Sequence, residues 1–195
     1  PIAICRAPFD LPLDDYGNTA LNVNDINDGS YDNCSITLMS VSRTTFNCAD
    51  LGLNPVTLRV DDPYGNYSYC ETQVNVVDKD GPTVVCVEFS TIALNSSGIA
   101  TLQADDLNII SYDACSANLS YSIDTSLFNC EDLGVHTVTL SVSDEYGNIN
   151  TCQSEVSVVD KTNPTVFCAE GINVQVDSFG IITLDPLALN GGCYD

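Results

Sequence analysis

The chain has 195 residues, of which 27 are acidic and 5 are basic, and its formal net charge is −22. A surface this acidic repels phosphate groups, which excludes nucleic acid as a partner. Hydrophobic residues form 44% of the chain, which excludes a disordered protein and is enough for packed cores.

The apolar pattern predicts strands. Val, Leu and Ile dominate the apolar residues, and no segment keeps a period of 3.6, so we expect little helix. Residues 56–60 alternate between apolar and polar side chains, PYGN at 63–66 predicts a hairpin turn, and residues 74–77 end the next strand. The same succession returns as a strand at 138–142, a turn at 145–148 and a strand at 156–159. About seven such strands in each unit predict an all-β fold of immunoglobulin-like β-sandwich type.

The sequence repeats itself with a period of 81 or 82 residues, since PIAIC at Pro1 is answered by PTVVC at Pro82 and by PTVFC at Pro164. Downstream, SYDNC corresponds to SYDAC, FNCADLG to FNCEDLG, and VVDKDGP to VVDKTNP. A fixed period of this length predicts tandem modules in an end-to-end array. Their predicted bounds are 1–81 for repeat one, 82–163 for repeat two and 164–195 for the opening of repeat three.

The third repeat ends two residues before the position that corresponds to the second cysteine of the other repeats. The sequence has no signal peptide and no transmembrane run, so we expect it to be a piece of a longer exported protein. Cys193 has no counterpart, because the matching positions hold Ser30 and Ser111. The bonding of Cys168 and Cys193 stays open.

Taken together, these motifs resemble a hyalin-type repeat. The combination of SYDNC, FNCADLG, VTLRVDDPYGN and a closing VVD before the next PTVVC is similar to the cysteine-bearing repeats of large surface adhesins of gliding Bacteroidota, such as the SprB type. The likeness covers all three segments. It implies an immunoglobulin-like fold, a place on the cell surface, and filaments that support adhesion or gliding. Hyalin-type proteins of the animal extracellular matrix are the alternative.

The 10 cysteines include no CxxC pair and accompany a single His, which argues against zinc and for disulfides in an extracellular compartment. Four cysteines in each full repeat allow three pairings. If the first strand of the sandwich runs parallel to the last, Cys5 lies near Cys70, which leaves Cys34 for Cys48. Repeat two would then pair Cys86 with Cys152, and Cys115 with Cys130.

Aspartates gather at the predicted junctions between repeats. In an end-to-end array, the linker after one sandwich meets loops of the next one, and carboxylates that converge from a linker and two loops are the oxygen ligands that Ca²⁺ requires. At the first junction the candidates are Asp78, Asp80, Asp106, Asp113 and Asp144. Their counterparts are Asp25, Asp32 and Asp62 in repeat one, and Asp160 and Asp195 at the second junction. This pattern predicts a joint that calcium makes rigid.

A purely structural role for these aspartates is the alternative. Asp62 and Asp144 stand where Asp closes a hairpin turn, and Asp often begins loops. The sequence also lacks the DxDxDG pattern of an EF-hand loop. Calcium binding is therefore a hypothesis that rests on where the loops meet.

Catalytic residues do not recur in the repeats. The single His, His136, aligns with Asn54, and acidic pairs such as Asp14 with Asp15 belong to predicted exposed turns. We therefore expect no enzymatic activity.

The leading interpretation is a structural spacer of an adhesin filament at the cell surface. Its first partners are neighbouring repeats of the same chain, and surface polysaccharide or other filament subunits are further candidates. The alternative is a glycan- or protein-binding module, in which Tyr31, Tyr112 and Tyr194 offer rings for stacking. The closely matched loop lengths of the repeats favour a spacer.

Overall fold

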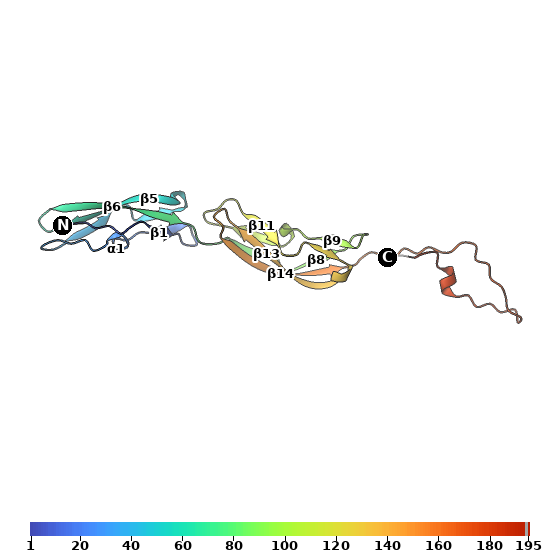
Figure 1. Cartoon of the computed structure of the whole chain (residues 1–195). Helices are drawn as coiled ribbons and strands as arrows, with labels where there is room; N and C mark the ends of the chain where they lie inside the picture. The colour runs from blue at the N-terminus through green and yellow to red at the C-terminus, as the bar shows by residue number, and fades with distance from the viewer. Residues whose placement is uncertain (194) are drawn as a thin grey trace.

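The computed structural model describes residues 1–193 and 195, in which two β-sandwiches lie end to end and an extended segment follows them (Figure 1). The first sandwich contains β1 (Phe9–Pro12), β2 (Asn18–Ala20), α1 (Val23–Ile26), β3 (Leu38–Val41), β4 (Thr45–Asn47), the 3-10 turn η1 (Cys48–Asp50), β5 (Gly52–Asp61) and β6 (Tyr67–Val77). The second contains β7 (Thr83–Cys86), β8 (Phe89–Ala93), β9 (Ile99–Thr101), η2 (Ala104–Asp106), β10 (Asn108–Tyr112), β11 (Ser120–Ile123), β12 (Leu127–Asn129), η3 (Cys130–Asp132), β13 (Gly134–Ser143) and β14 (Ile149–Val159).

Each sandwich has a four-stranded sheet with the same strand order, β1-β6-β5-β3 in the first and β8-β14-β13-β11 in the second. The two longest strands of each sheet form an antiparallel hairpin in which Leu58 faces Cys70 and Leu140 faces Cys152. The edge strands β1 and β8 run parallel to β6 and β14. The parallel relation between the first and last strands is the one on which the expected cysteine pairing depended.

The second layer of each sandwich consists of short strands. β2 pairs with β4, and β9 pairs with β12, both antiparallel. Phe46 from β4 is buried with Leu58 and Val60 from β5, and Phe128 from β12 is buried with Val138 from β13. The buried residues of the two cores lie within 11–76 and 94–158. Burial of each such side chain contributes about 1.5–3 kcal/mol, so alternating apolar residues on the long hairpin are the main source of core stability.

The hairpin turns form where PYGN and EYGN predict them. Gly65 and Gly147 have φ values of +88° and +89°, a conformation that side-chain-bearing residues rarely adopt. The carboxylate of the preceding aspartate accepts hydrogen bonds from the turn, with Asp62 Oδ1 2.8 Å from Asn66 N and Asp144 Oδ1 2.8 Å from Asn148 N. These turns fix the register of the long strands.

Residues 164–195 carry core-type side chains without a sandwich around them. Leu184 and Leu189 are 42% and 43% exposed, whereas their counterparts Leu102 and Leu107 are 1% and 0% exposed. The described part of this segment has the 3-10 turn η4 (Pro186–Leu189) and a bridge between Cys168 and Asn190, but no strand. The chain holds no counterparts of β11 to β14 against which these leucines would pack. Within residues 1–193 and 195, none of the helical segments has the length and hydropathy that crossing a bilayer requires.

Candidate metal centre and covalent joint between the two modules

Three carboxylates from separate parts of the chain meet at the junction between the sandwiches. Asp78 begins the linker after β6, Asp113 follows β10, and Asp144 precedes the turn between β13 and β14. One carboxylate oxygen from each lies within 4.8 Å of one from each of the other two. All three residues were predicted at this junction from the sequence.

Two of these carboxylates are held by their own loops. Asp113 Oδ1 accepts hydrogen bonds from the backbone N–H groups of Cys115 and Ser116, both at 2.8 Å. Asp144 Oδ1 accepts from Tyr146 and Asn148, and its Oδ2 accepts from the side chain of Asn148 at 2.7 Å. The Oδ2 of each carboxylate keeps at least one free lone-pair direction, because a carboxylate offers about four acceptor positions, two on each oxygen. The turn-forming role and a ligand role are therefore compatible.

Asp78 has no such support. Its Oδ1 accepts one hydrogen bond from the N–H of Asp80 at 3.2 Å, and its Oδ2 is buried without a hydrogen-bond partner in the described residues. Burial raises the pKa of Asp78 above its ordinary value near 3.8, and the negative charges of Asp113, Asp144 and Asp80 raise it further. An ionised Asp78 is consequently destabilising unless a cation lies beside it.

The basic side chain closest in sequence does not neutralise this cluster. Lys79 points to Asp10, with Nζ 3.3 Å from Oδ2, and the pKa of Asp10 is held below its ordinary range first by the Asn75 side chain and then by Lys79. Across residues 1–193 and 195, the four ion pairs involve other acids than Asp78, Asp113 and Asp144. A buried acceptor without a partner beside two fixed carboxylates fits a hard divalent cation such as Ca²⁺, which takes oxygen ligands in flexible geometry.

Other acidic residues line a cavity at this junction without belonging to the three-carboxylate cluster. Asp80, predicted at the junction from the sequence, lines a cavity of about 590 Å³ that Asp78 and Asp113 also line. Asp14 and Asp15, from the turn before β2, line this cavity as well. From the sequence these two were predicted only as an exposed pair. They follow β1, which runs parallel to the end of β6, so the expected parallel pairing of the first and last strands already indicated that they lie near the linker.

Asp106 and Asp25 have a different place. Each lies in a helical turn and accepts a hydrogen bond from the backbone N–H three residues before it, Gln103 at 2.8 Å for Asp106 and Asn22 at 2.7 Å for Asp25. These are capping interactions, which Asp commonly makes at the start of a helix. The structure therefore gives both residues a role in their own module, and among residues 1–193 and 195 neither belongs to the carboxylate cluster.

The counterparts of Asp113 and Asp144 in the first sandwich are Asp32 and Asp62. Asp32 Oδ2 lies 2.8 Å from the ammonium group of Pro1, and the pKa of Asp32 is lowered first by this hydrogen bond. The pKa of the ammonium is raised chiefly by Asp32, with a smaller electrostatic contribution from Asp62. Asp62 itself has a lowered pKa because the Asn66 side chain donates to it.

At the second junction, Asp160 and Asp195 line one cavity together with Cys130 and Gly98. They correspond to Asp78 and Asp113, so the arrangement of the first junction begins to recur. Tyr194, the third of the recurring tyrosines, lies outside the described residues.

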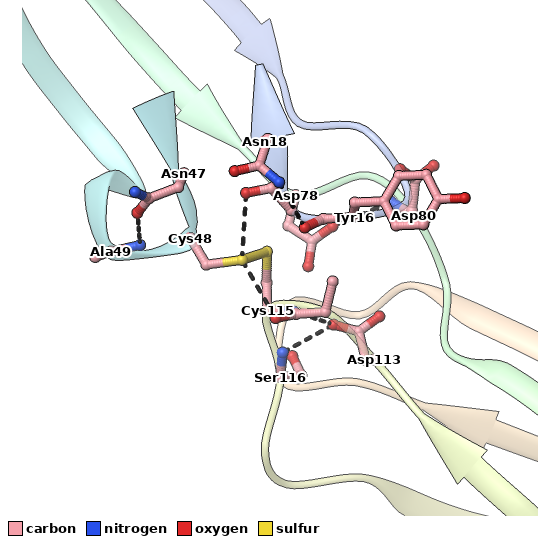
Figure 2. Close-up of a disulfide and its surroundings, with 12 residues drawn as sticks. Tyr16, Asn18, Asn47, Cys48, Ala49, Asp78, Asp80, Asp113, Cys115 and Ser116 are labelled. Carbon is pink, nitrogen blue, oxygen red and sulfur yellow. Dashed lines mark hydrogen bonds between the residues drawn. A yellow bond between two sulfur atoms is a disulfide. The ribbon is translucent and has the colours of Figure 1, made fainter. Parts of the chain in front are cut away.

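A disulfide crosses the first junction. Cys48, at the start of η1 in the first sandwich, is bonded to Cys115 in the second, with their Cα atoms 5.1 Å apart. Figure 2 shows this bond beside Asp78, Asp80 and Asp113. The covalent joint and the carboxylate cluster thus lie at the same junction.

This bond corrects half of the expected pairing. Cys5 is bonded to Cys70 and Cys86 to Cys152, as expected. The pairs Cys34 with Cys48 and Cys115 with Cys130 are wrong, since Cys34 and Cys130 are exposed free cysteines.

The physical reason is strand length. Cys48 lies just before the start of β5 at Gly52, whereas Cys34 lies near its end, where Thr37 N donates to Asp61 O at 2.8 Å. A strand of 10 residues spans about 33 Å, far beyond the reach of a disulfide. A signal for the correct pairing was present, because Cys115 follows Asp113 by two residues and Asp113 was already predicted at the junction.

His136 has a structural environment. Its Nε2 lies 2.6 Å from the carbonyl oxygen of Asp132, and its ring lies 5.6 Å from the ring of Phe128. Asn54, the counterpart of His136, donates from its side chain to the carbonyl oxygen of Asp50 at 2.6 Å. Both side chains therefore hold the turn that enters the long strand.

No protein-family model matches the chain, and no curated protein is similar to it in sequence. Among solved structures it is similar to the extracellular domain of protocadherin GammaB4, with 16% identity and a TM-score of 0.33, over 85% of this chain and 33% of that one. It is also similar to repeats EC1-2 of human protocadherin-24, with 17% identity and a TM-score of 0.36, over 80% of this chain and 95% of that one. Immunoglobulin domains 1–4 of Sidekick-1 match at 10% identity and a TM-score of 0.29, over 85% of this chain and 52% of that one. The chain spans about a third of the length of the protocadherin GammaB4 structure.

Proposed function

We propose that these modules are non-enzymatic spacers of an extracellular adhesion protein, and that Ca²⁺ bound at the junction helps to hold consecutive modules in line. The observation that carries the proposal is the convergence of the linker and two loops of the next module on one point, where Asp78, Asp113 and Asp144 meet beside the Cys48–Cys115 bond. A joint that is both covalently tied and charged in this way serves to fix the angle between modules.

The disulfides support an extracellular place for the chain, because such bonds persist in oxidising compartments. The repeat motifs extend the proposal to filaments of the hyalin-type adhesins of gliding bacteria, where such modules would support adhesion or gliding motility at the cell surface. Each long strand spans about 33 Å, so each stacked module adds at least this length to a fibre. Partners of the chain are then its neighbouring repeats, and surface polysaccharide or other filament subunits beyond them.

A glycan-binding module is the rival function, and the tyrosines are its best support. Tyr31 and Tyr112 are 54% and 57% exposed. Tyr112, however, lines the junction cavity beside Asp113, and Tyr31 bridges to Ile2 at the corresponding end of the first module. Their place at the module ends favours a role in the joint.

Calcium titration of the full chain tests the proposal. A cation that binds only the folded state adds about 2.7 kcal/mol to the free energy of unfolding when its free concentration is 100 times its dissociation constant. We expect calcium to raise the melting temperature and to narrow the distribution of interdomain angles in small-angle scattering, and a chelator to reverse both.

A matched pair of variants shows where the ion binds. Asp144→Asn should weaken the calcium response. Asp62→Asn changes the corresponding turn aspartate, which accepts the same hydrogen bonds from Tyr64 and Asn66 but does not belong to the three-carboxylate cluster, and should leave the response intact. Equal responses of the two variants, or no calcium binding by calorimetry at millimolar concentration, would overturn the calcium joint.

A further inference from the structure

The two exposed free cysteines of the modules, Cys34 and Cys130, occupy the positions that are bonded at the first junction. Cys130 corresponds to Cys48, and Cys34 corresponds to Cys115. In this pattern one cysteine of each module bonds to the following module and another bonds to the preceding module. In the two complete modules, the first kind is unbonded in repeat two and the second kind is unbonded in repeat one.

The surroundings of Cys130 match those of Cys48. Cys48 Sγ lies 3.7 Å from the carbonyl oxygen of Gly17, and Cys130 Sγ lies 3.9 Å from that of Gly98. Each cysteine opens a 3-10 turn in which the preceding asparagine accepts from the second following N–H, at 2.9 Å for Asn47 and 2.7 Å for Asn129. The free thiol is therefore held as the bonded sulfur is held.

Cys34 likewise matches Cys115. In both loops the preceding aspartate accepts from the cysteine N–H at 2.8 Å, from Asp32 for Cys34 and from Asp113 for Cys115. Asp195, the counterpart of Asp113, lies in the cavity that Cys130 lines, together with Asp160. The residue two positions before the expected partner cysteine thus lines the same cavity as Cys130.

We infer that Cys130 and Cys34 are the two halves of further joints of the Cys48–Cys115 type. Cys130 bonds to the SYDxC cysteine of a module that follows repeat two, and Cys34 bonds to the FNC cysteine of a module that precedes repeat one. The partner in each case is a module of this same repeat type. Consecutive modules then form a covalent ladder in which each one is disulfide-bonded to both neighbours. This inference rests on the proposed spacer role and adds the residues that couple one module to the next.

The chemistry balances with a small-molecule disulfide as oxidant. One thiolate attacks a sulfur of glutathione disulfide, which forms a mixed disulfide and releases one glutathione thiolate. The second cysteine, as its thiolate, attacks the protein sulfur of that mixed disulfide and releases the second glutathione thiolate. The two protons lost by the cysteines are taken up by the two leaving thiolates, so one protein disulfide and two molecules of reduced glutathione result.

The assignment of Cys130 is tested by extending the chain at its C-terminus so that repeat three is completed. Asp195 corresponds to Asp113, so a copy of residues 114–163 placed after Asp195 completes repeat three with counterparts of Cys115 and Cys152. After oxidative refolding with glutathione disulfide, peptide mapping without reduction should recover Cys130 linked to the copied counterpart of Cys115. Alkylation of Cys130 should fall at least about tenfold relative to the 195-residue chain, since a bonded sulfur is no longer a thiolate nucleophile.

Controls for this chain are built into its other cysteines. A link between Cys168 and the copied counterpart of Cys152 reports that repeat three has folded. Cys130→Ser in the extended chain should leave the copied counterpart of Cys115 open to alkylation. Cys130 that stays alkylatable, or that bonds to another cysteine, in a chain with a folded repeat three overturns the assignment.

A second extension tests Cys34 independently. A copy of residues 1–81 placed before Pro1 recreates the sequence of the native linker, and its own Cys5–Cys70 bond reports folding. Cys34 should then link to the copied counterpart of Cys48, and Cys34 that stays free beside a formed Cys5–Cys70 bond overturns the ladder. Disulfide mapping of the extended chains in the absence of calcium separates this test from that of the proposed function. The expected disulfides can form when calcium has no effect, and calcium can stabilise the chain when these disulfides do not form.

Discussion

The sulfur of Cys48 lies 3.7 Å from the carbonyl oxygen of Gly17. Gly17 has a φ of +71°, and a Cβ at this position would run into the Cys48 sulfur and lie 3.1 Å from the Cys115 sulfur. Glycine is therefore required here both for the backbone conformation and for the room that the joint disulfide occupies. Gly98 stands in the same relation to Cys130.

Gly17→Ala should hinder the joint disulfide. Gly29→Ala is the matched control, because Gly29 has a φ of +84° and a Cβ added there would have no atom within 4 Å. Both substitutions force alanine into the left-handed region at a cost of about 1–2 kcal/mol, but only the first crowds the sulfurs. Alkylation followed by mass spectrometry should find free Cys48 and Cys115 in Gly17→Ala alone. Equal disulfide yields in the two variants would contradict the role assigned to Gly17.

Asp78→Asn should act in opposite directions with and without calcium. In chelator, the substitution removes a buried charge that lies beside two carboxylates, so the melting temperature should rise by about 2–4 °C for a gain of roughly 0.5 kcal/mol. With calcium, the variant lacks a ligand and should gain less stability than the wild type. Thermal unfolding of both proteins under both conditions tests this, and a loss of stability in chelator would show that the Asp78 charge is already compensated within the fold.

The same pair of proteins should differ in pH dependence. The pKa of Asp78 is raised in the folded state above its ordinary value near 3.8, so between these values the folded state binds more protons than the unfolded one. Its contribution to stability is present below the ordinary value and is lost as the pH rises through the raised one. In chelator, the advantage of Asp78→Asn should be small at low pH, grow through this window and then level off. An advantage that shrinks as the pH rises would have the wrong sign.

Removal of an intramodule disulfide should destabilise its sandwich. Cys5 and Cys70 close a loop with a sequence separation of 65, and release of such a loop in the unfolded chain costs about 3–4 kcal/mol. Cys5→Ala combined with Cys70→Ala should lower the free energy of unfolding of the first module by this amount in urea titrations followed by tyrosine fluorescence. The second module, closed by Cys86–Cys152, serves as the internal reference. A change below about 1 kcal/mol would mean that the loop is already restrained in the unfolded state.

His136→Asn should leave the protein unchanged. The substitution reproduces Asn54 of the first module, which donates to the carbonyl oxygen of Asp50 in the way His136 contacts that of Asp132. We expect a melting temperature within about 2 °C of the wild type, as for most substitutions outside a core. Loss of any measurable activity on a panel of hydrolase and transferase substrates would contradict a non-enzymatic spacer.

The long hairpins were predictable from sequence because their stability is local. Val56, Leu58 and Val60 alternate with polar residues, and Gly65 can supply the positive φ of the turn. Each of these features determines the local backbone within a few residues, and each occurs in both repeats. The short strands of the second layer, such as β2 with β4, depend on distant pairing and leave a weaker pattern.

The candidate site was predictable only where topology decided it. Asp78, Asp113 and Asp144 were placed at one end because a linker must meet the loops of the next module. Asp106, also expected at the junction, caps a short helical turn in the structure, and the sequence does not distinguish such an aspartate from one that faces a junction. The cysteine pairs failed for a different reason, since pairing was assumed to close within a module and the partner of Cys48 belongs to the next one.

The pattern of disulfides also determines how the chain carries tension. A pull along the fibre enters the first module near Cys5, crosses to Cys70, runs through the backbone to Cys86 and crosses again to Cys152. The separations of 65 and 66 residues that these two bonds bridge would each add about 220 Å of slack if they could unravel. With the bonds intact, only the short stretch through the linker can be drawn out. A thread built from such units should therefore transmit load with little extension, and reduction of its disulfides should turn the same thread into a highly extensible one.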